Sequence, residues 1–193
     1  MKKVLIFLLV LILTVGATGL FACKKEEEPP AEEPHTHFFE QGVCKECGEF
    51  DPAYDRYFKF EATADGKYLM SAKKISIPDL VVVPSKYNGI AVFGIEKSGF
   101  DSKDNINVVM ISEGVESIGE QAFSNCHELV KITIPESIQI INRYAFHGCS
   151  KLTEIIFSGT KEEWKKVEKI GSWHYLVPAT LVRCSDGEIG IDE

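Results

Sequence analysis

The chain has 193 residues, with 29 acidic against 21 basic side chains and a formal net charge of −8. A surface of this sign repels phosphate backbones, which disfavours nucleic acid as a partner. The sequence has no G-x-S-x-G, no H-E-x-x-H and no glycine-rich phosphate loop. We therefore expect a protein that is not an enzyme, and a hydrolase with an unrecognised site is the weakest of three functional hypotheses.

The first 23 residues, MKKVLIFLLVLILTVGATGLFAC, place two lysines ahead of a long apolar run, which is the layout of a secretory signal. The run is long enough to cross a bilayer, so an uncleaved anchor is the alternative. Its end, LFAC, resembles a bacterial lipoprotein signal: the small Ala22 precedes Cys23, although Phe21 is bulkier than that pattern usually has. The resemblance implies cleavage after residue 22, acylation of Cys23 and a lipid anchor on the outer side of a bacterial membrane.

An acidic segment follows at residues 23–34. Loss of residues 1–22 would leave 19 basic against 29 acidic side chains, because only Lys2 and Lys3 lie in the signal. The stretch KKEEEPPAEEP contains five glutamates and three prolines. Such a segment cannot bury apolar surface, and its like charges extend it. We expect a solvated spacer between the membrane and a folded domain.

Residues 35–50, HTHFFEQGVCKECGEF, gather side chains that bind metals. His35 and His37 are two residues apart, so in an extended segment their rings lie on one side. Cys44 and Cys47 form a C-x-x-C pair before a glycine, and a tight turn of this spacing lets both thiolates reach one ion. Two imidazoles and two thiolates would complete a closed, structural zinc site.

This stretch resembles small His/Cys cassettes that precede the main domain of other bacterial surface proteins. A Cys44–Cys47 disulfide, or two thiols, is the alternative outside the cytoplasm. We expect the cassette to share few contacts with the rest of the chain. A zinc-capturing lipoprotein, with the cassette as its functional part, is the second hypothesis.

The main domain is expected to occupy residues 51–193. Residues 58–72 predict a hairpin that turns at Asp65 and Gly66. A 23-residue period then runs from about residue 80 to residue 158, and a period in this range indicates a solenoid whose units bury their apolar faces against each other. The recurring columns are Ile95-Ile118-Ile141, Phe100-Phe123-Phe146, Ile106-Leu129-Leu152, Val92-Val115-Ile138 and Val109-Ile132-Ile155.

Each unit predicts one strand and one tight return. LVKITIPESIQI at 129–140 alternates apolar and polar residues until Pro135, which is typical of a short strand. NRYAFHGCSKL at 142–152 places Phe146 and Cys149 at near-helical spacing and predicts a turn or short helix that inserts the ring into the stack. Cys149 and its equivalent Cys126 are expected to be buried packing residues, and a disulfide between them is the alternative.

These columns resemble the BspA-like (treponemal-type) leucine-rich repeats, whose pattern is I…IP.SI..I…AF..CS.L. The resemblance implies an α/β leucine-rich-repeat solenoid with parallel strands, one in each coil. It also implies a role in adhesion to host matrix proteins, with which such proteins are associated.

The period ends at FSGTKEEWKKVEKIG, residues 157–171. Thr160 and Glu163 predict a capping box, and Gly171 predicts the end of the helix. Trp164 and Val167 share one face of this helix, so we expect it to cover the apolar end of the last coil. Residues 181–187 predict a closing strand and turn.

The strand pattern also predicts a binding face. Lys131 and Thr133 should point outward, because the apolar residues between and beside them point into the stack. Their neighbours one repeat away complete two rows, which are Val108–Lys131–Glu154 and Met110–Thr133–Ile156. Exposed Met and Ile side chains beside a charge pair suit a protein-binding patch, and an ordinary solvated sheet is the alternative. The first hypothesis is therefore a membrane-anchored module that binds a protein or glycan outside the cell.

Overall fold

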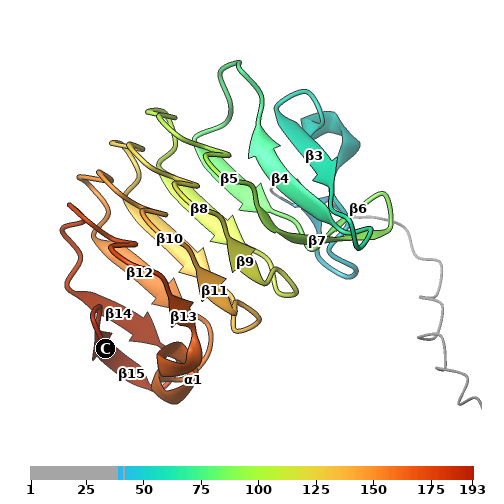
Figure 1. Ribbon diagram of the computed structural model, residues 1–193. Coiled ribbons are helices and arrows are strands. Elements are labelled where there is room, and N and C mark those ends of the chain that lie inside the picture. The colour runs from blue at the N-terminus through green and yellow to red at the C-terminus, as the bar shows by residue number, and fades with distance from the viewer. Residues whose placement is uncertain (1–38, 41) are drawn as a thin grey trace, which may run out of the picture. The chain divides into compact units, whose positions relative to one another are not determined.

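The computed structural model describes residues 39–40 and 42–193 (Figure 1). The expected signal, the acylated Cys23, the acidic spacer, His35 and His37 lie outside the described residues. Within the described part, none of the helices has the length and apolar character needed to cross a bilayer.

The described chain winds into a solenoid of about five turns, made mostly of parallel strands with little helix (Figure 1). One side is a sheet of six strands, here called the front sheet, in which every strand runs parallel to its neighbours except the last. In order across the sheet its strands are β5 (Leu80–Val83), β8 (Val108–Ile111), β10 (Lys131–Ile134), β12 (Glu154–Phe157), β14 (Leu181–Cys184) and β15 (Gly187–Gly190).

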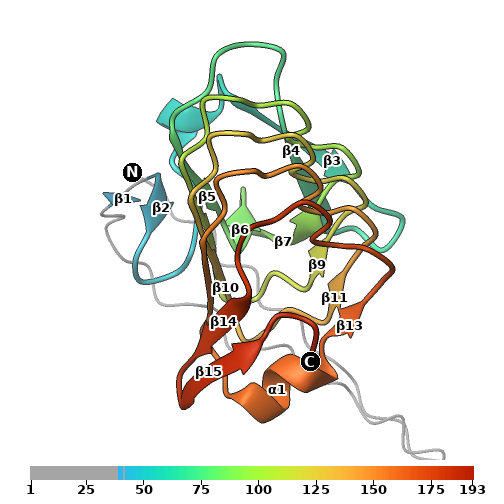
Figure 2. The same cartoon turned by 90° about the vertical axis from the view of Figure 1, so that its left-hand side faces the viewer.

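The opposite side is a second sheet, here called the back sheet, and Figure 2 shows the two sheets on opposite sides of the coils. It begins with the predicted hairpin, whose strands β3 (Phe58–Ala62) and β4 (Tyr68–Ala72) pair antiparallel around the turn at Gly66. Its remaining strands are β7 (Ile90–Ile95), β9 (Ser117–Ile118), β11 (Ile140–Ile141) and β13 (Glu168–Lys169), with β6 (Lys86–Tyr87) paired to β7.

The back-sheet strands of the coils were not predicted. Sequence analysis expected one strand in a coil, and the front sheet provides it. β9, β11 and β13 add a second strand that is only two residues long. Two residues are too few to show an alternating pattern, so only the pairing between coils defines these strands.

The predicted phenylalanine column forms the centre of the core. Phe123 is fully buried, and its ring centroid lies 5.1 Å from that of Phe100 and 5.6 Å from that of Phe146, with interplanar angles of 19° and 3°. The segments that carry these rings are tight turns and not helices. The stack explains why each unit repeats an aromatic residue at this position.

The repeated cysteines are buried packing residues, as predicted. Cys126 and Cys149 are fully buried, and each thiol donates to the carbonyl oxygen of the preceding coil's phenylalanine, at 3.1 Å in both cases. Burial raises the pKa of the Cys126 thiol to about 12 and also raises the pKa of Cys149. Both thiols are therefore protonated, which matches their role as donors.

Helix α1 (Lys161–Lys166) covers the last coil. Its capping box forms as predicted: the Thr160 hydroxyl accepts from the Glu163 backbone, and the Glu163 carboxylate accepts from the Thr160 backbone. Trp164 is fully buried, with its ring 5.2 Å from that of Phe157. The expectation that the helix continues to Gly171 is wrong, because Val167 is already extended and the next two residues join the back sheet as β13.

The expectation that the cassette shares few contacts with the rest of the chain is also wrong. The described part of the cassette contains the strands β1 (Phe39–Glu40) and β2 (Val43–Cys44), and a short 3-10 helix follows it at Pro52–Tyr54. Between β2 and this helix lies Phe50, whose side chain is buried at 3 % exposure. Its ring lies 5.2 Å from Phe60 and 6.1 Å from Tyr87. Burial of this aromatic ring in the core stabilises the folded state, and it holds the adjoining turn against the rest of the domain.

Candidate functional site

The two predicted rows are present on the outer face of the front sheet. Lys131 pairs in register with Val108 on one side and Glu154 on the other. Thr133 pairs in the same way with Met110 and Ile156. The geometry of the predicted face is therefore confirmed, whereas its binding of a partner stays a prediction.

The second row continues at both ends beyond the predicted residues. Val82 of β5 lies in register with Met110, and Arg183 of β14 lies in register with Ile156. Sequence analysis missed Val82 and Arg183 because insertions shift them from the 23-residue period. Once those insertions are known, the alternation of inward and outward side chains along β5 and β14 places Val82 and Arg183 on the outer face.

The outer face exposes apolar side chains among its polar ones. Met110 is 38 % exposed and Leu181 48 %. The inward neighbours Val109 and Ile132 are fully buried, as the alternation requires. Exposed apolar side chains on one continuous sheet face are typical of an interaction surface.

Two loose ion pairs cross the same face. Lys131 Nζ lies 3.4 Å from Glu154, and Arg183 Nε lies 3.8 Å from Glu188. Ion pairs on the turn side are closer, at 2.7 Å for Lys151–Glu128 and 2.9 Å for Lys97–Glu120. Charge-assisted hydrogen bonds are usually about 2.7–2.9 Å long, so the two front-sheet pairs are longer than this range.

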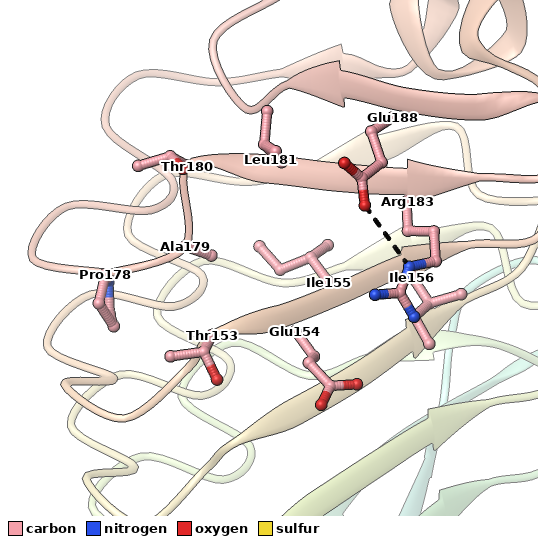
Figure 3. A pocket seen from close by; sticks show the side chains of 10 residues that line it. All are labelled: Thr153, Glu154, Ile155, Ile156, Pro178, Ala179, Thr180, Leu181, Arg183 and Glu188. Carbon is pink, nitrogen blue, oxygen red and sulfur yellow. Dashed lines mark ion pairs between the residues drawn. The ribbon is translucent and has the colours of Figure 1, made fainter.

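A cavity of about 220 Å³ lies at the C-terminal end of this face (Figure 3). Registered pairing of β12 with β14 begins only at Ile155 and Val182, and the cavity opens beside the residues that precede this pair. Figure 3 shows Glu188 and Arg183 facing each other at one side of it. The lining residues are Thr153, Glu154, Ile155, Ile156, Pro178, Ala179, Thr180, Leu181, Arg183 and Glu188.

A larger groove of about 520 Å³ lies at the N-terminal end, between the front sheet and the cassette. Figure 2 places β1 and β2 on the side of the front sheet that faces away from the back sheet. Val82 and Met110 line the groove from the sheet, and residues 43–48 line it from the cassette. The predicted binding face is thus bordered by one hollow at each end.

The C-x-x-C segment forms the tight turn that was predicted. The Gly48 N–H donates to the Cys44 carbonyl at 2.9 Å, and the Cys44 N–H donates to the Glu49 carbonyl at 2.8 Å. Gly48 has a φ of 73°, which favours glycine. Cys44 is buried and Cys47 is half-buried. Among the described residues no group of three or more His, Cys, Asp or Glu side chains could hold a metal, and two of the four expected zinc ligands lie outside them.

Two histidines bind carboxylates on other parts of the surface. His127 Nδ1 lies 2.8 Å from Asp104, and His174 Nε2 lies 3.0 Å from Asp192. Asp104 and His127 are one period apart, as are the partners of the Lys97–Glu120 and Lys151–Glu128 ion pairs. These contacts connect successive coils, and opposite charges at a spacing of 23 are the sequence signal that predicts them.

Comparison with known proteins agrees with this architecture. Residues 92–174 match the family model described as the BspA type leucine rich repeat region, in six copies. A leucine-rich repeat protein from Bacteroides capillosus is 24 % identical, with a TM-score of 0.55 over 66 % of this chain and 94 % of that one. The T. pallidum leucine rich repeat protein is 21 % identical, with a TM-score of 0.54 over 66 % of this chain and 69 % of that one.

A leucine-rich repeat protein from Bacteroides ovatus is 23 % identical, with a TM-score of 0.52 over 64 % of this chain. The chain spans only 33 % of the length of that protein. No curated protein matches the chain. The shared fold shows that the chain has the leucine-rich repeat architecture, and the model match shows that residues 92–174 are similar to leucine-rich repeat regions of the BspA type.

Proposed function

We propose that the chain is a binding module displayed outside a bacterial cell, and that its front sheet recognises an extracellular protein or glycan in an adhesion-type role. The observation that carries this proposal is the outer face of the front sheet. Exposed apolar side chains and loosely paired charges lie there between two hollows. Leucine-rich repeats are binding scaffolds by construction, because stacked strands present one continuous surface.

Display requires an anchor, and we propose the lipid-modified Cys23 for it. The support is the sequence: two lysines, an apolar run and Ala22 before the cysteine. Two acyl chains hold a protein on a membrane without a basic patch. Residues 24–34 would then act as the spacer between membrane and solenoid.

We propose no catalytic role. His127 and His174 pair with aspartates as links between segments, the His147 ring stacks on that of Tyr175, and the two repeated cysteines are buried and protonated. None of these arrangements supplies an activated nucleophile.

For the cassette we propose one structural zinc ion, held by His35, His37, Cys44 and Cys47. The tight turn from Cys44 to Gly48 supports this, because it is the kind of turn from which two thiolates reach one ion. A zinc-capturing function is the second candidate. A closed set of four ligands, in a segment that is packed against the core through Phe50, favours the structural role. Slow release of zinc to a competing chelator would support it, and rapid exchange would favour capture.

The front sheet can be tested by binding of the full-length chain to arrays of extracellular matrix proteins and cell-wall glycans. Met110→Asp should weaken binding about tenfold or more, because a charge would enter the apolar part of the face. Ile90→Asp is the matched control, since Ile90 is 41 % exposed, close to the 38 % of Met110, but belongs to the back sheet. Equal losses for the two variants, or none for Met110→Asp, would contradict the proposal.

A further inference from the structure

The groove at the N-terminal end of the front sheet is built from two parts of the chain that are distant in sequence. One wall is the turn of the cassette, and the other is the outer face of β5 and β8 with the loops that follow them. Its lining residues are Val43, Cys44, Lys45, Glu46, Cys47, Gly48, Val82, Ser85, Met110, Ser112 and Glu113. Neither part forms the groove alone.

The cassette wall is held in place by backbone contacts. The Lys86 N–H donates to the Gly48 carbonyl at 3.2 Å, and the Phe50 N–H donates to the Lys86 carbonyl at 3.2 Å. The Glu49 carboxylate accepts from the Gly89 N–H at 2.9 Å. Gly48 lies so close to the sheet that a Cβ there would be 2.0 Å from the Ser85 hydroxyl oxygen. The groove is therefore part of the folded domain and has a defined width.

The interior of the groove is suited to an aliphatic group. Val43, Val82 and Met110 form the apolar part of its lining, where Val43 and Val82 are half-buried and Met110 is 38 % exposed. The charged residues Lys45, Glu46 and Glu113 line it as well. A methionine side chain is flexible and polarizable, so it adapts to the shape of a ligand. The volume of about 520 Å³ lies within the range of ligand sites, about 300–1,000 Å³.

Two features identify the class of ligand. The groove is open along the surface, so it cannot enclose most of a small free molecule, as small-molecule sites do. It suits one group of a larger partner that also covers the adjoining rows. None of its lining residues is aromatic, whereas sugar rings bind by stacking their apolar faces on aromatic rings. The openness therefore favours a large partner over a small free molecule, and the lining without aromatic residues favours a polypeptide over a glycan.

We propose that this groove receives an aliphatic side chain of a partner polypeptide, with the cassette as its outer wall. The inference rests on the proposed binding function of the front sheet and names polypeptide as the partner class. It also assigns the cassette a direct part in binding.

Methyl-labelled methionine gives a reporter within the groove. The chain has three methionines, and of the two in the described region Met70 is fully buried while Met110 lines the groove. The probes are N-acetyl-leucine N-methylamide, its glycine equivalent and methyl β-glucoside, each titrated into the full-length chain. The leucine probe should shift the Met110 methyl signal saturably and leave Met70 unchanged. The glycine probe should bind at least about tenfold more weakly than the leucine probe, because it lacks the apolar side chain.

Two variants test the two walls separately. Val43→Asn makes the cassette wall polar, and Ser112→Phe fills the groove from the sheet side without altering the cassette. Each should weaken the leucine probe about tenfold, the change expected for one buried aliphatic contact. Ile156→Asn, at the other end of the same row, is the control and should leave the titration unchanged.

Three results would overturn the inference: no saturable shift at Met110, a shift with the glucoside but not the leucine probe, or a leucine shift that survives both groove variants. If Met110→Asp abolishes binding to the arrays but the leucine probe causes no shift of the Met110 signal, this inference is overturned and the proposed function stands. Array binding that is indifferent to Met110→Asp would overturn both.

Discussion

Phe123 carries the clearest prediction about the stability of the solenoid. Its side chain is fully buried between the rings of Phe100 and Phe146, at centroid distances of 5.1 and 5.6 Å. Phe→Ala at a buried site lowers the free energy of unfolding by about 3–5 kcal/mol, because the site cannot close around the cavity. Loss of two stacked pairs places Phe123→Ala at the upper end of that range. The total free energy of unfolding of a typical domain is only about 5–15 kcal/mol.

The assay is urea unfolding of the full-length chain followed by far-UV circular dichroism. Phe123→Ala should lower the midpoint strongly and leave a single transition, since the coils on both sides lose the same contact. Thr133→Ala, on the outer face of β10, should change the free energy by about 0.5 kcal/mol or less. Tyr175→Ala is the aromatic control, because that side chain is 54 % exposed. A larger loss for Thr133→Ala than for Phe123→Ala would refute the assignment of inner and outer strand faces.

Three further predictions concern the cysteines. Cys23→Ser should leave the precursor uncleaved or release it unanchored, while the unaltered chain partitions into detergent; identical behaviour of both would contradict the lipid anchor. We expect one zinc per chain by mass spectrometry, with an affinity that falls as pH falls because Cys44 and Cys47 bind as thiolates. Chelation should also lower the melting temperature of the domain, since Phe50 joins the cassette to the core; a metal-free chain with a complete Cys44–Cys47 disulfide would contradict the site. The Cys126 thiol has its pKa raised from 9.0 to about 12, so the folded state holds a proton that the unfolded state loses above pH 9. Stability should therefore be constant below pH 9 and fall by about 1.4 kcal/mol per pH unit for this thiol as pH rises toward 12, and Cys126→Ala should show a smaller slope.

The period predicted most of the solenoid because it identifies neighbours directly. Residues 23 apart lie one coil apart, so the sequence alone placed Phe123 between its two equivalents and Lys131 between Val108 and Glu154. The capping box of α1 was equally predictable, because Thr160 and Glu163 interact within one helical turn.

The groove could not be predicted by the same means. Val43 lines the same groove as Val82 and Met110 only because the segment around Glu49 pairs beside Lys86, and no repeat or local spacing relates these positions. Phe50 was counted with the cassette because it follows the cysteines in sequence, although its ring contacts lie in the hairpin and in β6. Contacts between aperiodic segments depend on tertiary packing, which composition and spacing do not report.

The front sheet has a definite width across its described strands, which begin at β5 and reach the antiparallel strand β15. Its six strands, at a spacing of about 4.8 Å, span about 24 Å. An extended peptide covers that distance with about seven residues. A partner polypeptide that lay across these six strands would therefore contact them over a short linear segment, however long the partner itself is.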